Sequence, residues 1–231
     1  EGLAFGAAAW VHACVVGRPV DEATRKANRW PFQGARPRET KAALIRARNF
    51  GYQVVDHAPD AAMRIARSVI GNEIGAIMRG QSEIGPRALG HRSIIGVAAA
   101  PDHHWRINRI KQREKWRPLG PIVTSDLFGK YFRGPKNPYM LATCEVTTPR
   151  TPSARHADGS ARTQVLDNDP VLEPSMRTLE KNGKPGVLIN TSLNGRRSPM
   201  FDDARDLIDF MHENEDLRYA LIEDALVSKP G

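Results

Sequence analysis

Two short patterns bring together residue types that bind phosphate: Lys111 and Arg113 are separated by one residue, and so are Ser192 and Asn194. Side chains two apart share a face on an extended segment, whereas on a helix they point to different sides. If both pairs lie on extended chain, an ammonium, a guanidinium, a hydroxyl and an amide can converge. Lys supplies a compact charge, Arg a planar fork that fits phosphate oxygens, and Ser and Asn supply neutral hydrogen bonds. The two pairs together predict an anion-binding pocket.

The basic residues of the chain are concentrated around the first of these pairs. The chain has 231 residues, with 34 Lys and Arg against 26 Asp and Glu and a net charge of +8. Between Arg79 and Arg117, nine basic residues stand against only Glu83, Asp102 and Glu114. Glycines and prolines interrupt this stretch, which places several cations on loops where backbone amides are also free to bind an anion. The interruptions argue against a continuous basic helix for nucleic acid and leave a solvated basic face or a phosphate pocket.

The composition excludes several classes of protein. With 40% hydrophobic residues the chain can bury a sizeable core, so it is not a disordered segment. The longest run of low polarity, Gly2 to Gly17, contains His12 and is shorter than the roughly 18 to 20 apolar residues of a membrane span. Only Cys14 and Cys144 are present and no export signal is visible, which indicates a reducing, cytoplasmic location.

Apolar spacing and terminating residues predict helices and strands that interleave. Small apolar residues predict a closely packed helix over Gly2–Val16, and the polar, Pro- and Gly-containing segment 25–38 is typical of a linker. Further helices are predicted over 39–49, 60–70, 101–110, 174–181 and 203–212, and strands over 52–55, 73–78, 93–97, 119–123, 140–146, 186–189 and 221–227. This order predicts an α/β or α+β sheet domain.

Four segments, taken in order, resemble the C-terminal domain of the O-carbamoyltransferases. They are the runs IGPRALGHRSI (84–94), KQRE with RPL (111–114 and 117–119), HADGSAR (156–162) and NTSLN (190–194). This family is similar to nodulation-protein and antibiotic-tailoring carbamoyltransferases, and the likeness covers about residues 35–231. The run from Gly85 to Ser93 is its most specific part.

The resemblance implies a YrdC-like fold, shared with threonylcarbamoyl-adenylate synthases. We therefore expect a twisted mixed sheet flanked by helices over residues 31–231. Residues 1–30 are then expected to be the terminal helix and linker of a preceding actin- or sugar-kinase-like domain. The chain would be a fragment of a longer polypeptide, and Lys229–Pro230–Gly231 fits the end of a domain.

The resemblance also implies a reaction. The domain would use carbamoyl phosphate and ATP, with Mg²⁺, to form carbamoyl-adenylate, and release phosphate and pyrophosphate. The preceding domain, with a His-rich Fe²⁺ site, would then transfer the carbamoyl group to a hydroxyl of a secondary metabolite, such as an antibiotic, or of an oligosaccharide. The expected partners are thus ATP, carbamoyl phosphate and that domain of the same polypeptide, with no nucleic acid, no membrane and no metal site here; a homodimer is compatible with the sequence.

The roles that the resemblance assigns follow from the charge of the two substrates. Four cations are expected to neutralise the α-phosphate and the leaving pyrophosphate, with no general base: Lys111, Arg113, Arg87 and Arg92. Ligand binding is expected from Ser192, Asn194, Asn190, Arg162, Asp158, Ser160 and His156. Residues 156–162 would form a loop that closes over the site; the alternative is a polar loop in which Asp158 pairs with Arg162. Arg196 and Arg197 depart from the acidic residue and Pro usual in the family at this point, which puts the role of their loop in doubt.

Other candidates and functions are weighed against this expectation. Trp105 and Trp116 could stack on adenine, but aromatic residues beside an apolar helix face are usually core. His103 and His104 are adjacent and face different ways on a helix, which argues against a shared metal. A YrdC-like RNA- or nucleotide-binding module without transferase activity, and a regulatory remnant with an inactive site, stay open as alternatives. Cations clustered among glycines and 6% aromatic residues favour a compact phosphate pocket over a stacking platform.

Overall fold

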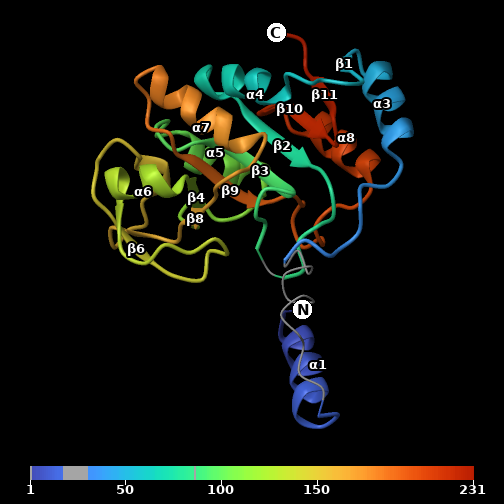
Figure 1. Ribbon diagram of the computed structural model, residues 1–231. Helices are drawn as coiled ribbons and strands as arrows, with labels where there is room; N and C mark the ends of the chain where they lie inside the picture. Colours follow the sequence, from blue (N-terminus) through green and yellow to red (C-terminus); the bar gives the residue numbers. More distant parts are fainter. Residues whose placement is uncertain (1, 18–30, 86) are drawn as a thin grey trace.

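The centre of the protein is an eight-stranded mixed sheet (Figure 1). The structure, a computed structural model, describes residues 2–17, 31–85 and 87–231. Two pairs of neighbouring strands, β10 with β2 and β4 with β8, are parallel, and the other pairs are antiparallel. In sheet order the strands are β1 (Gln53–Val55), β11 (Ala225–Ser228), β10 (Leu217–Ile222), β2 (Ile74–Met78), β3 (Arg92–Val97), β9 (Leu188–Ser192), β4 (Gly120–Val123) and β8 (Gln164–Val165).

Helices cover both faces of this sheet (Figure 1). One face packs against α3 (Thr40–Asn49), α5 (His103–Ile110), α6 (Ser125–Tyr131) and α8 (Ala204–Glu213), and the other against α4 (Ala61–Ile70) and α7 (Leu172–Lys181). Each strand contributes side chains to the cores on both faces of the sheet, because successive side chains point to opposite faces. In β2, for example, Ile74, Ala76 and Met78 join the first core and Ile77 the second. The expected fold class, a mixed sheet flanked by helices, is confirmed.

A smaller three-stranded sheet extends from the main one and carries the loop that contains residues 156–162. It consists of β5 (Phe132–Arg133), β6 (Cys144–Val146) and β7 (Ser160–Ala161), with the short 3₁₀ helix η1 (Pro152–Ala154) between β6 and β7. The segment between η1 and β7 holds His156 and Asp158. The small sheet therefore positions the predicted 156–162 loop.

The N-terminal segments are only partly as expected. The predicted first helix is present as α1 (Gly2–Cys14), and Trp10 and Val11 on it are exposed. Residues 25–30 of the expected linker lie outside the described residues, but 31–38 are bonded to the domain and are not a free linker. Gly34 donates its amide to the Ser82 carbonyl at 2.9 Å, and Arg38 donates to that of Asp202 at 2.7 Å. We call residues 31–38 the entry segment.

Several predicted boundaries are wrong, and turns explain why. The expected strand over 221–227 is a hairpin of β10 and β11, because Glu223 has a left-handed φ of 52° that reverses the chain. The expected strand over 140–146 is limited to β6, and Met140 before it also has a positive φ of 54°. The short elements α6 and β8 were not predicted. Among the described residues, no helix is long and apolar enough to cross a membrane.

Candidate functional site

The four residues singled out from the two short patterns meet at one place. Nζ of Lys111 donates to the carbonyl oxygens of Ser192 at 2.6 Å and Asn194 at 2.8 Å. It also contacts Ser192 Oγ at 3.1 Å and the Asn194 side-chain oxygen. Ser192 Oγ in turn donates to Asn194 Oδ1 at 2.7 Å. Arg113 lines the same cavity of about 550 Å³, so the predicted convergence is present; we call this cavity the tetrad pocket.

Lys111 and Arg113 reach the pocket from a helix end and not from an extended segment. Lys111 is the C-cap of α5, and Gln112 after it has a left-handed φ of 47° that ends the helix. Extended backbone, the condition under which the convergence was predicted, is therefore not the conformation at Lys111 and Gln112. Buried Asn108 holds the loop that follows: its Oδ1 accepts from Arg113 Nε at 2.5 Å, and its Nδ2 donates to the Arg117 carbonyl at 2.9 Å. Residues 113–117 are thus fixed by an amide inside α5.

Lys111 and Arg113, in the tetrad pocket, have no carboxylate partner among the described residues. Burial, and then repulsion from Arg113, lower the pKa of Lys111 to about 7. Burial and Arg117 lower the pKa of Arg113 to about 10, and its Nη2 is buried with no hydrogen-bond partner in the described part of the chain. The carboxylate that lines the pocket, Glu114, pairs with Arg117 at 2.7 Å. A bound anion would therefore relieve an unfavourable arrangement of charge.

Arg196 and Arg197 also line the tetrad pocket. Both are exposed, and they follow directly on the loop of Ser192 and Asn194. The departure from the family pattern at this point thus adds positive charge to the pocket.

A second frame fixes the loop 83–92, which carries the most specific sequence run. Buried Glu83 accepts through Oε1 from the amides of Leu89 at 2.6 Å, His91 at 2.9 Å and Arg92 at 3.3 Å. Ser93 Oγ accepts from the Gly90 amide at 2.9 Å. The carboxylate therefore acts as an internal template on which the loop backbone folds.

Two buried amides hold the same loop from the sheet side. Asn190 Nδ2 donates to the Ala88 carbonyl at 2.8 Å, and Gln164 Nε2 donates to the Leu89 carbonyl at 2.8 Å. Asn190 Nδ2 also lies 3.4 Å from Gln164 Oε1, and Asn190 Oδ1 is buried without a hydrogen-bond partner from residues 2–17, 31–85 or 87–231. Asn190 was expected to bind ligand; in this structure its contacts are to the loop and to Gln164.

The placement of Arg92 does not support a role in the anion pocket. Its side chain is fully buried in β3, and its five N–H groups all have acceptors. These are the carbonyls of Ala35, Arg79, Gly80 and His91, and the carboxylate of Asp202 at 3.3 Å. No donor is left for phosphate, because Arg92 ties the entry segment to the loop 83–92 and to the segment after Asn194. We therefore correct its assignment to a structural residue.

Arg87 and Arg162 form a second group of cations. Burial lowers the pKa of Arg162, and repulsion from Arg87 lowers it further. Arg162 Nε is buried and has no hydrogen-bond partner among the described residues. The alternative in which Asp158 pairs with Arg162 is not observed: Asp158 accepts from Ser160, from its amide at 2.9 Å and its hydroxyl at 2.7 Å. A bound anion would thus relieve the repulsion that Arg87 exerts on Arg162.

A chain of hydrogen bonds determines which nitrogen of His156 carries a proton. The Ser160 amide and hydroxyl lower the pKa of Asp158, so its carboxylate is ionised and accepts a hydrogen bond from the Ser160 hydroxyl. Ser160 Oγ must then accept from His156 Nδ1, which lies 3.2 Å away. Because burial lowers the pKa of His156, its Nε2 is an unprotonated acceptor at neutral pH.

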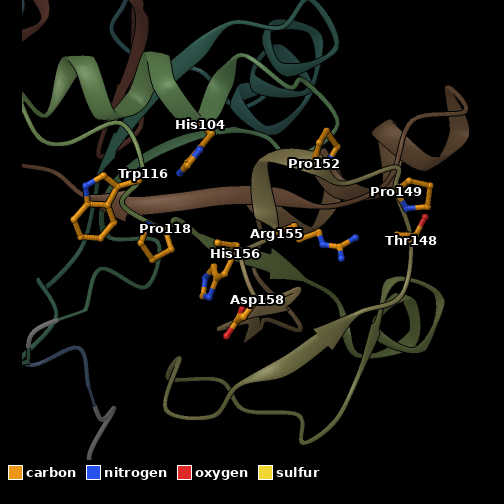
Figure 2. A pocket seen from close by; sticks show the side chains of 10 residues that line it. His104, Trp116, Pro118, Thr148, Pro149, Pro152, Arg155, His156 and Asp158 are labelled. Atoms are coloured by element: carbon orange, nitrogen blue, oxygen red, sulfur yellow. The ribbon is translucent and has the colours of Figure 1, made fainter.

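A larger cavity of about 780 Å³ lies beside this histidine (Figure 2). Its walls come from the loop after α5 and from the segment around η1, and most of them are apolar. The lining residues are His104, Trp116, Pro118, Thr148, Pro149, Pro152, Arg155, His156, Ala157 and Asp158. We call it the proline-lined cavity.

The tryptophan and histidine side chains on α5 and on the loop after it differ from expectation in one respect. Trp105 and Trp116 are not core residues: their side chains are 41% and 74% exposed. Trp105 lies under the Arg109 guanidinium, 4.9 Å from it. His103 is buried and bonded to backbone, with Nδ1 accepting from the Val97 amide at 3.0 Å.

Comparison with known proteins identifies the family. The family model described as carbamoyltransferase C-terminus matches residues 66–229. The chain belongs to this family. This carbamoyltransferase C-terminal domain is 33% identical over 153 residues to nodulation protein U of Sinorhizobium fredii, covering 64% of the chain and 27% of that protein. It is 33% identical over 165 residues to 3'-hydroxymethylcephem-O-carbamoyltransferase of Streptomyces clavuligerus, covering 70% and 31%.

The chain therefore spans between a quarter and a third of the length of these relatives. Among solved structures, full-length HypF in its phosphate- and nucleotide-bound form gives a TM-score of 0.48 at 12% identity, covering 71% of the chain and 25% of HypF. MTH1692 from Methanobacterium thermoautotrophicum gives 0.45 at 15% identity, covering 72% and 76%.

Several residues that shape the site of this carbamoyltransferase C-terminal domain were not singled out from the sequence. Glu83, Asn108 and Gln164 act through buried hydrogen bonds to loop backbone, and nothing in their sequence spacing distinguishes them from surface polar residues. Arg117 carried a usable signal, because it lies in the run RPL of the family likeness and follows Lys111 and Arg113 closely.

Proposed function

We propose that this domain binds ATP and carbamoyl phosphate and forms carbamoyl-adenylate. The observation that carries the proposal is the buried Lys111 ammonium beside Arg113, whose Nη2 is unpartnered, with neither paired to a carboxylate of the described residues. A second pair of cations, Arg87 and Arg162, is not among the residues that line the tetrad pocket. Two anionic substrates would need two groups of this kind.

The proposed reaction has two steps. Water attacks the carbonyl carbon of carbamoyl phosphate, and the bond from that carbon to the phosphate oxygen breaks, which gives carbamate and phosphate. A carbamate oxygen then attacks the α-phosphorus of ATP. The new P–O bond forms as the bond from the α-phosphorus to the bridging oxygen of pyrophosphate breaks. Catalysis would come from positioning and from charge neutralisation, as in other phosphoryl and nucleotidyl transfers.

Each cation group has a proposed task. Lys111, Arg113 and Arg117 would bind the triphosphate and stabilise the leaving pyrophosphate, with Ser192 and Asn194 orienting it. Arg87 and Arg162 would bind carbamoyl phosphate. Mg²⁺ would be held chiefly by the ATP phosphates, with Glu114 the carboxylate that lines the pocket, and would offset part of the phosphate charge.

The acceptor step is proposed for the longer protein. The relative named 3'-hydroxymethylcephem-O-carbamoyltransferase suggests a hydroxyl acceptor by its name. We propose that transfer to such an acceptor, in the cytoplasm, requires a preceding domain with Fe²⁺, and that residues 1–30 belong to that domain and its linker.

Pyrophosphate release from ATP tests the proposal, measured with and without carbamoyl phosphate. We expect release that depends on carbamoyl phosphate in the wild type and falls at least 100-fold in Lys111→Ala. Lys115→Ala is the matched control, because Lys115 is an exposed lysine on the same loop. Pyrophosphate release that does not depend on carbamoyl phosphate, or an equal fall in its rate in Lys111→Ala and Lys115→Ala, would contradict the proposal. Tight, salt-sensitive RNA binding in its place would support the alternative of an RNA-binding module.

A further inference from the structure

The entry segment, which precedes α3 in the chain (Figure 1), pairs with the start of the loop 83–92. The Ile84 amide donates to the Pro31 carbonyl at 2.7 Å, and the Ser82 amide donates to the Ala35 carbonyl at 2.9 Å. These backbone bonds belong to neither sheet. They connect the point at which the chain enters the domain to the loop that carries Arg87.

An aromatic stack joins the same two segments near the other end of the loop. The ring of Phe32 stacks on that of His91, with centroids 3.9 Å apart and planes 24° apart. The His91 amide donates to Glu83 Oε1 at 2.9 Å, and its Nδ1 donates to the Gln81 carbonyl at 2.7 Å. The entry segment therefore contacts the loop both before and after Arg87.

The last residue of the entry segment is fixed elsewhere, at the start of α8. The Arg38 amide donates to the Asp202 carbonyl at 2.7 Å, and the Arg38 carbonyl accepts from the Ala204 amide at 2.9 Å. This anchor does not involve the loop 83–92. A local disturbance of the contact between the entry segment and Ser82 is thus expected to displace the loop and not the whole segment.

Gly34 lies so close to Ser82 that the two segments leave no room for a side chain. A Cβ at Gly34 would overlap Ser82 Oγ and would lie 3.0 Å from the Ser82 carbonyl oxygen. The φ angle of Gly34 is not in the left-handed region, so an alanine could adopt the same backbone conformation. Gly34→Ala therefore pushes the entry segment and the loop apart by steric contact alone.

The entry segment contacts no ligand in the proposed chemistry, yet it is bonded to a loop that does. We propose that it is a coupling element: it positions Arg87 for an anion, and an anion bound by Arg87 stabilises the entry segment in return. Such coupling is reciprocal, because two events that favour the same arrangement must favour each other. Phe32 and Gly34 are then positioning residues, which act on the ligand through the loop.

The coupling gives the chain before the domain a route to the site. Residues 1–30 are proposed above to belong to a preceding domain and its linker, and they lead directly into the entry segment. A displacement of that domain would be transmitted to Arg87, and binding at Arg87 would be transmitted to that domain. The inference rests on the proposed function only for the identity of the anion, carbamoyl phosphate.

Amide hydrogen exchange of the whole chain, with inorganic phosphate as the ligand, tests one direction of the coupling. The Gly34 amide donates to the Ser82 carbonyl, so its exchange reports whether the pairing is closed. In the wild type, saturating phosphate should slow this exchange at least about 5-fold. In Arg87→Ala, phosphate bound elsewhere should leave it unchanged.

The same measurement on Gly34→Ala tests the other direction. The amides of Leu89 and His91, which are bonded to Glu83, should exchange at least about tenfold faster than in the wild type, with exchange in α4 unchanged. Gly129→Ala is the matched control, because it adds the same methyl group to an exposed glycine where a Cβ would meet no described atom within 4 Å. It should exchange as the wild type does.

The kinetics of pyrophosphate release separate positioning from stability. Gly34→Ala should raise the KM for carbamoyl phosphate about 10- to 100-fold and leave the KM for ATP unchanged. A loss of folded protein would lower the rate without changing either KM. Adding Ser82→Ala removes the hydroxyl that the new methyl group would overlap, so the double variant should recover most of the loss. Phe32→Ala should resemble Gly34→Ala, whereas Phe32→Tyr, which keeps the stacked ring, should resemble the wild type.

Several results would overturn the inference. They are a Gly34 amide whose exchange phosphate does not slow, or slows equally in Arg87→Ala; unchanged exchange at Leu89 and His91 in Gly34→Ala; and an equal rise of both KM values. If Gly34→Ala does not fold, Phe32→Ala against Phe32→Tyr makes the same comparison.

Failure of the coupling and failure of the proposed function are distinguishable. If carbamoyl phosphate does not stimulate pyrophosphate release while both exchange results are as expected, the reaction is wrong and the coupling stands. If the wild type shows the reaction and Gly34→Ala changes neither the exchange nor the KM for carbamoyl phosphate, the coupling is wrong and the reaction stands.

Discussion

The ammonium of Lys111 donates to the carbonyl oxygen of Ser192 at 2.6 Å, in a pocket where no carboxylate pairs with it among the described residues. The neutral oxygens of Ser192 and Asn194 hold this group in place without balancing its charge. Its pKa of about 7 therefore lies within the physiological range.

We predict that phosphate ligands bind more weakly as the pH rises above 7, because Lys111 loses its proton in the free protein. Linkage of one proton gives a fall of up to about tenfold per pH unit. Titrations of tripolyphosphate binding between pH 6 and 9 measure it. In Lys111→Arg the guanidinium stays charged throughout, so this part of the pH dependence should vanish. Identical slopes in the two proteins would show that Lys111 does not titrate in this range.

Substitutions of Arg87 and Arg92, which are five residues apart, should affect different properties of the protein. We expect the Arg92 variant to lose stability and the Arg87 variant to lose activity. Arg92→Met removes five hydrogen bonds from a fully buried position and leaves Asp202 unpaired, so it should lower the free energy of unfolding by about 3 to 5 kcal/mol. Arg87→Ala should leave stability within about 0.5 kcal/mol and lower the carbamoyl-phosphate-dependent rate about 100-fold. Denaturant unfolding and pyrophosphate release, measured on both variants, separate the two roles. A stable, inactive Arg92→Met would return Arg92 to the pocket.

Two substitutions of Glu83 should differ in stability if its carboxylate holds the backbone of the loop 83–92 in place. Glu83→Ala leaves the amides of Leu89, His91 and Arg92 without their acceptor, so we expect a loss of about 3 kcal/mol or more. Glu83→Gln keeps one acceptor oxygen and should recover at least half of this loss. Urea unfolding of the two variants measures both values. Equal stability of the two variants would mean that the carboxylate does not template the loop.

Arg196 and Arg197 should contribute to nucleotide affinity through long-range charge. Replacing both with Ser should weaken ATP binding about 3- to 10-fold at low salt, with a smaller effect at 0.5 M salt because exposed charges are screened. The melting temperature should hardly change, since both side chains are exposed. Isothermal titration at the two salt concentrations tests this. Unchanged affinity at low salt would exclude their participation.

The sequence predicted the interleaved helices and strands well where apolar periodicity was strong, as in α4, β2 and α8. It also brought Lys111, Arg113, Ser192 and Asn194 to one pocket, although the backbone that does so is a helix C-cap and not extended chain. Arg92 was misassigned because the sequence does not distinguish a buried arginine that is bonded to carbonyl groups from an arginine that binds substrate. Burial of Glu83, Gln164 and Asn190 depends on tertiary contacts, which a single sequence does not display.

The order of strands in the sheet determines when the sheet can be completed during translation. β2 lies between β10 and β3, yet β10 follows β2 in the chain by more than a hundred residues, and β1 pairs with β11 alone. Contacts of such long range form late and fold slowly. The edge of β2 that β10 will cover stays open until nearly the whole chain has been synthesised, while the loop 83–92 and Lys111 are already outside the ribosome. The site can thus mature only after translation of the last strands, and the nascent chain would depend on a chaperone or on fast synthesis to keep that edge from pairing with another strand.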